Sequence, residues 1–206
     1  MYIKIPEHKY SMTFLENPFV RQTLFEFDSL LKAPFDVPEM WWIVAPLLAV
    51  IFIMTFYFGK YIKEKLGYNT ALGNSVVLFF VCIDLLRHIY NYTSPASFEN
   101  YAWNPLTTAI ILMIILESIL LLSAAFEHAL PEKVMYFIAS PVAVNVQAYV
   151  MAAIVYTQSE PTFYTFMAAL LLFIIMIVIL RIVKEIEHLT LGYHFKKTVP
   201  EKKSKK

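Results

Sequence analysis

Long apolar stretches recur along the chain and alternate with short polar connections. A helix needs roughly 20 residues to cross a hydrocarbon core about 30 Å thick. Five stretches reach about this length, at residues 41–59, 70–90, 105–126, 134–156 and 163–183. Because backbone polar groups in lipid must bond within their own segment, each stretch is expected to be a helix. The sequence therefore predicts an all-α, polytopic transmembrane bundle of about five spans.

The segment before the first span has a different pattern. Residues 18–32 are too charged to cross a membrane, yet their apolar residues recur at helical spacing. This pattern predicts an interfacial amphipathic helix, and a helix that merely caps the bundle is the alternative. We therefore divide the chain into an extramembrane segment (1–40), a transmembrane domain (41–188) and a basic tail (189–206).

Two prolines lie inside the predicted spans. Pro46 belongs to the first span and Pro141 to the fourth. A proline inside a helix removes a backbone hydrogen bond, so each should kink its helix. We expect a neighbouring helix or side chain to cover the carbonyl groups that are freed.

Composition supports a membrane location. Hydrophobic residues make up 59% of the 206 residues, against roughly 45–50% in soluble domains. With five spans, twelve lysines and arginines fall on the side of the C-terminus and four on the side of the N-terminus. This excess predicts a cytoplasmic C-terminus and an outside N-terminus, in the cell membrane.

The end of the chain is strongly basic, with six lysines among its last eleven residues. Lysines near a membrane surface are attracted to anionic lipid head groups. We expect this role for four of them, Lys196, Lys197, Lys202 and Lys203. A nucleic-acid partner is not expected, because no aromatic residues or binding motif accompany the lysines.

Three charged residues and one amide inside the spans are the candidate functional residues. Charged groups are costly in the bilayer, so each should face another helix or water. The span positions put Asp84 slightly outside the midplane and Arg87 about one turn further out. They put Glu117 just inside the midplane, with Asn145 at a similar level to Glu117. Side chains lean toward the N-terminus of their helix, so Arg87 and Glu117 should reach toward each other. The sequence predicts one polar cluster of these four residues near the midplane.

Other chemistry has less support in the sequence. Asp84 and His88 are four residues apart on one helix face, but a metal site needs further convergent ligands. The chain also lacks the common hydrolase motifs and a glycine-rich phosphate loop. We therefore predict no metal or cofactor.

Two classes of function remain open. In the first, the protein is a non-enzymatic membrane subunit or scaffold, whose helices pack against other membrane subunits or a second copy of the chain. In the second, it is a small transporter or channel for ions, protons or small solutes that uses Asp84, Arg87 and Glu117. The cluster would fix helix register in the first class and line a path in the second. A membrane-bound enzyme is the least supported reading.

Overall fold

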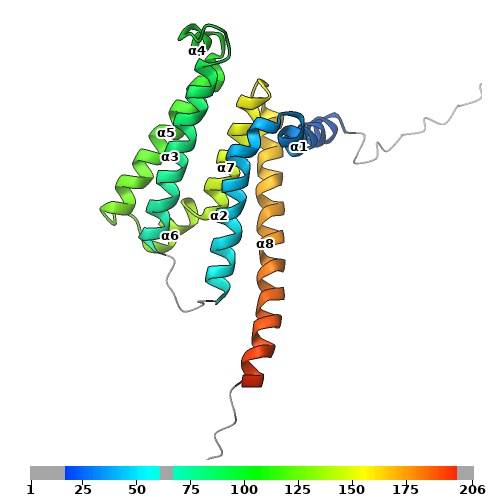
Figure 1. The fold of residues 1–206 in the computed structure, drawn as a ribbon, viewed down its shortest axis with the longest axis vertical. Helices are drawn as coiled ribbons and strands as arrows, with labels where there is room; N and C mark the ends of the chain where they lie inside the picture. Colours follow the sequence, from blue (N-terminus) through cyan, green and yellow to red (C-terminus); the bar gives the residue numbers. More distant parts are fainter. Residues whose placement is uncertain (1–16, 61–66, 199–206) are drawn as a thin grey trace, which may run out of the picture.

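A computed structural model of the protein describes residues 17–60 and 67–198, and within these ranges it contains helices and no strands. Figure 1 shows their arrangement. The helices are α1 (Pro18–Asp36), α2 (Trp41–Lys60), α3 (Tyr68–Tyr90), α4 (Glu99–Trp103), α5 (Pro105–Phe126), α6 (Glu132–Ile138), α7 (Pro141–Tyr156) and α8 (Phe163–Thr198), with a short 3-10 helix, η2 (Pro38–Met40), before α2.

Several of these helices are long and apolar enough to cross a membrane. Among the described residues, four stretches qualify: α3, α5, α6 with α7, and the first 21 residues of α8. A fifth is reached if α1 and the following Pro38–Met54 segment, bent by 87° relative to each other, count as one span. The predicted all-α, membrane-spanning bundle is therefore confirmed.

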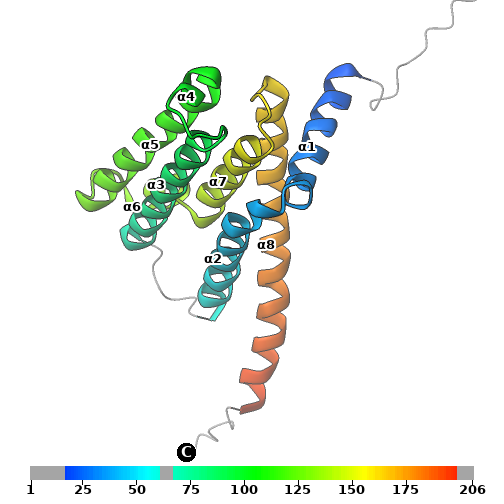
Figure 2. The same cartoon turned by 45° about the horizontal axis from the view of Figure 1, so that its top comes forward.

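Helix α7 lies at the centre of the bundle. It packs against α3 on one side and against α2 and α8 on the other, and α5 packs along α3 (Figures 1 and 2). Most α7 side chains are buried. The remaining long helices thus form two groups, α3 with α5 and α2 with α8, joined through α7.

The fourth predicted span is broken at the proline. Helix α6 ends at Ile138 and α7 begins at Pro141, whose preceding residue Ser140 caps the new helix by accepting a hydrogen bond from the Ala143 amide. Asn74 of α3 donates to the free Ala139 carbonyl at 2.7 Å. The predicted kink is therefore a complete break, and a neighbouring helix supplies the covering group. By contrast, Pro46 lies within α2, which continues to Lys60.

The predicted amphipathic segment forms α1, which extends to Asp36. It lies across one end of the bundle, beside α8 (Figure 2). The hydroxyl of Tyr149 on α7 donates to the Leu30 carbonyl at 2.7 Å, and Thr165 of α8 donates to Glu26 at 3.2 Å. These polar contacts attach α1 to both helices.

Helix α8 continues beyond the predicted span at 163–183. It runs for 36 residues to Thr198, across the expected boundary between the transmembrane domain and the basic tail. The physical reason is that the first proline beyond the span is Pro200. Before it, the strongest helix-breaking residue is a single glycine, Gly192. Lys202 and Lys203, and the side chains of Lys196 and Lys197, lie outside the described residues. Their proposed contact with head groups stays a prediction.

Candidate functional site

The structure brings two of the four predicted polar residues together and places the other two elsewhere. The Arg87 guanidinium donates to Asp84 Oδ1 through Nε at 2.9 Å and through Nη2 at 2.6 Å. Glu117 of α5 instead accepts a hydrogen bond from Gln147 of α7 at 2.7 Å. Asn145 donates to the Pro141 carbonyl of its own helix at 2.6 Å. The expected single cluster is therefore three separate contacts.

Helix rotation explains why Arg87 does not reach Glu117. The buried side of α3 carries residues such as Leu78, Cys82 and Leu85, and the Glu117 carboxylate lies near Cys82. At about 100° per residue, Asp84 lies about 160° around the helix from Cys82. Depth in the membrane predicted that Arg87 and Glu117 could reach each other, but depth contains no information on which way each side chain points.

The Asp84–Arg87 pair lies close to the end of its helix, which is at the residue where the predicted span also ends. Arg87 is three residues from the last residue of α3, Tyr90, which corresponds to about 4.5 Å along the axis. The side chain of Arg87 is 65% exposed and that of Asp84 is 34% exposed. An exposed ion pair at a helix end fits the lipid head-group region, where a long arginine side chain reaches water.

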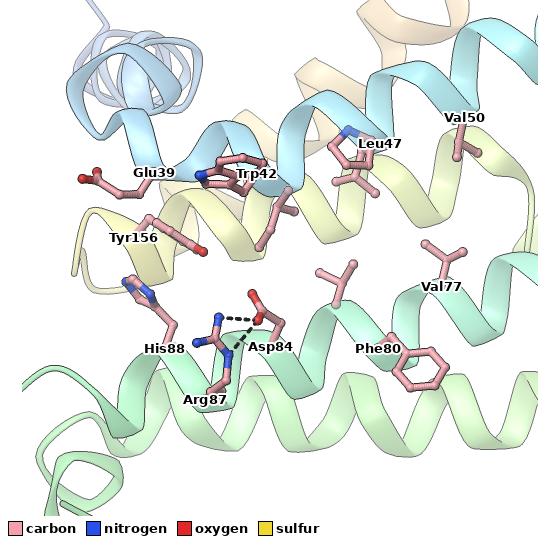
Figure 3. A pocket seen from close by; sticks show the side chains of 13 residues that line it. Glu39, Trp42, Leu47, Val50, Val77, Phe80, Asp84, Arg87, His88 and Tyr156 are labelled. Atoms are coloured by element: carbon pink, nitrogen blue, oxygen red, sulfur yellow. Dashed lines mark hydrogen bonds and ion pairs between the residues drawn. The ribbon is translucent and has the colours of Figure 1, made fainter. Parts of the chain in front are cut away.

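A cleft of about 630 Å³ separates α2 from α3, and the Asp84–Arg87 pair points into it (Figure 3). One end of the cleft is polar and lies where several helices begin or end. Its residues are Glu39, Trp42, Asp84, Arg87, His88 and Tyr156. Away from this end the walls are apolar, with Leu47 and Val50 of α2 facing Val77 of α3 (Figure 3) and with Phe80 also in the lining. The cleft is therefore polar at one end and apolar along the rest, which matches the two parts of an amphiphilic molecule.

A ring contact joins α3 and α7 at the polar end of the cleft. The His88 ring stacks on the Tyr156 ring, with a centroid separation of 3.9 Å. Glu39 of η2 and Asp84 of α3 line the same end of the cleft. Residues from η2, α3 and α7 therefore lie at one level of the bundle.

Sequence reasoning missed most of this polar end. It treated His88 only as a weak metal ligand and did not connect Glu39, Trp42 or Tyr156 with Asp84. The available signal was their position, because each lies at or near a predicted span end on the same membrane side. Within residues 17–60 and 67–198, no group of three or more His, Cys, Asp or Glu side chains is placed to hold a metal ion.

Together these features define the class of the protein, an all-α bundle whose helices are long and apolar enough to span a membrane. No protein-family model, curated protein or solved structure matches the chain. Any more specific function must therefore be argued from the geometry of its polar contacts and clefts.

Proposed function

We propose that the protein is a non-enzymatic membrane subunit or scaffold. The observation that carries this proposal is the hydrogen bond from Gln147 to Glu117, which joins α7 to α5. Polar side chains that bond across helices stabilise helix association in membranes. Glu117 lies near the middle of α5, where an acidic side chain costs the most free energy in a bilayer. Here that side chain serves to join two helices.

The centre of the bundle offers further support, because apolar side chains fill it. The buried residues of α7 include Val144, Ala148, Met151 and Val155, which lie one above another along the helix. The larger described cavities instead lie on the flanks of α7. One is the cleft between α2 and α3, and the other is an apolar cleft of about 530 Å³ lined by α5, α7 and α8. Lateral clefts of this kind suit contacts with neighbouring molecules in the membrane.

Purification from native membranes in a mild detergent tests the proposal. A tagged full-length chain should retain another membrane subunit or a second copy of itself in a fixed ratio. A photo-reactive phenylalanine analogue at Phe166, which lines the apolar cleft, should cross-link to that partner. The same analogue at Phe137 of α6, which is 72% exposed outside this cleft, serves as the matched control. A chain that is monomeric in lipid nanodiscs and cross-links only to lipid would contradict the proposal.

A transporter of ions, protons or small solutes is the second candidate. The Asp84–Arg87 pair favours it, because both residues line an open cavity. Flux should be measured in proteoliposomes for Asp84→Asn and Glu117→Gln, with Glu99→Gln on α4 as the control. If a flux is present and disappears in the first two variants while all three stay folded, transport replaces the scaffold proposal.

We further propose that the C-terminus faces the cytoplasm and the N-terminus faces outside. The lysine and arginine distribution supports this orientation. Because Cys82 is buried, single cysteines added at Glu99 and Ser204 are suitable labelling sites. In intact cells, an impermeant maleimide should label the cysteine at position 99 and not that at position 204. The reverse labelling would show the opposite orientation.

A further inference from the structure

The cleft between α2 and α3 is polar at the helix ends and apolar along the helices, as a site for a membrane lipid would be. Trp42 is the second residue of α2 and Tyr156 is the last of α7, so the polar end lies at helix ends. The apolar walls continue from there along α2 and α3 (Figure 3). In a bilayer the polar end is then at the head-group level and the walls are beside the acyl chains. The volume of about 630 Å³ lies within the roughly 300–1,000 Å³ of small-molecule sites.

The charges at the polar end indicate which head group fits. Arg87 is neutralised by Asp84, to which two of its five N–H groups are bonded. Glu39 adds a further negative charge at the same end of the cleft. Setting His88 aside, the polar end thus has two carboxylates and one guanidinium, an excess of negative charge. A head group with a net negative charge is disfavoured there, whereas one with both a phosphate and an ammonium finds a partner for each.

Aromatic rings strengthen the case for an ammonium group. Trp42 and Tyr156 line the same end of the cleft as Glu39 (Figure 3). Indole and phenol faces attract ammonium and quaternary ammonium groups, and an adjacent carboxylate adds Coulomb attraction. The remaining N–H donors of Arg87 suit phosphate oxygens.

We propose that this cleft binds one zwitterionic phospholipid. Its phosphate contacts Arg87, and its ammonium group lies near Glu39, Trp42 and Tyr156. An acyl chain lies between Val50 and Val77. The inference is independent of the proposed function, because either a scaffold or a transporter can hold this lipid.

The test uses the delipidated full-length protein in detergent and three dioleoyl phospholipids with choline, ethanolamine or glycerol head groups. Binding is measured by native mass spectrometry. The choline or ethanolamine lipid should bind about tenfold more tightly than the anionic glycerol lipid. Glu39→Gln should abolish most of this preference, because it removes the partner of the ammonium group. Glu99→Gln, which changes an exposed acidic residue outside the cleft, should leave the preference unchanged.

A second pair of variants tests the acyl-chain site. Val77→Trp fills the apolar part of the cleft and should reduce bound lipid several-fold, whereas Val178→Trp on the exposed face of α8 should not. Equal binding of the anionic and zwitterionic lipids by the unmodified protein would overturn the proposal. So would equal lipid retention by the two tryptophan variants. If Val77→Trp does not fold, the head-group comparison with Glu39→Gln decides the question alone.

Discussion

Helices α7 and α8 are both apolar, yet they occupy opposite environments. In the span formed by α6 and α7, 67% of the most apolar window is buried inside the bundle, against 11% in α8. The more hydrophobic of the two is α8. In water this order would be reversed, because the most apolar helix would be the most buried one.

The difference shows what drives packing when lipid surrounds the protein. For the side chains of α8, acyl chains are as favourable an environment as other helices. Its large side chains such as Ile174 and Val178 therefore stay on the outside. In α7, small residues such as Ala148, Ala152 and Ala153 are fully buried. Small residues let helix backbones approach closely, which is the main source of helix association in membranes. Residue size and polarity, more than hydrophobicity, therefore mark the central helix.

The largest expected effect comes from enlarging a buried alanine of α7. Ala152→Leu forces a bulky side chain into a fully buried position, which should cost about 1–3 kcal/mol or more. Ala109→Leu, at an exposed position of α5, should cost little. The folded fraction after solubilisation and the free energy of unfolding in an SDS titration measure both. Equal losses in the two variants would remove the distinction between central and peripheral helices.

The next effect concerns the polar contact of α7 with α5. Gln147→Leu leaves the partly buried Glu117 carboxyl without its amide donor, at a cost of about 1–3 kcal/mol. The double variant with Glu117→Leu replaces both partners by apolar groups and should recover most of this loss in the same SDS titration. If the two single losses simply add, the contact does not couple the helices.

A smaller effect is expected from pH at the end of α7. The Tyr92 hydroxyl donates to the Val155 carbonyl, and burial raises the pKa of Tyr92 from 10.0 to about 12. Since the raised value favours the protonated form in the folded state, its stabilising contribution is complete below pH 10 and is lost as pH rises toward about 12. The melting temperature should fall over this range. At pH 9, Tyr92→Phe should melt at a lower temperature than the unmodified protein. Its melting temperature should fall less as the pH is raised further. Parallel plots of melting temperature against pH for the two proteins would refute this role of Tyr92.

The smallest effect is expected at the exposed pair in the cleft. Arg87→Met and Asp84→Asn each break an ion pair whose side chains are largely accessible, so the free energy of unfolding should fall by less than about 1 kcal/mol. The SDS titration used for the α7 variants measures this loss on the same scale. A loss as large as that of Gln147→Leu would mean that the cleft is closed and dry in the membrane.

The positions of the helices were largely predictable, whereas the contacts between them were not. The five apolar stretches, the α1 helix and a disturbance of the helix at Pro141 follow from local properties of the chain, although a kink was expected there and not a complete break. The pairing of Glu117 with Gln147 instead depends on how α5 and α7 are rotated about their axes. The same holds for Asn74, which covers the Ala139 carbonyl from a helix distant in sequence.

The sequence by itself determined that this chain forms membrane-length helices and which stretches of the chain form them. The reason is that the bilayer sets a length and an apolarity that a segment either has or lacks. Only the tertiary structure decided that α7 is central, that Arg87 faces α2 and not α5, and that Glu39, Trp42 and Tyr156 share a cleft with it. These features depend on side-chain size and helix rotation, which arise from the packing of all the helices together.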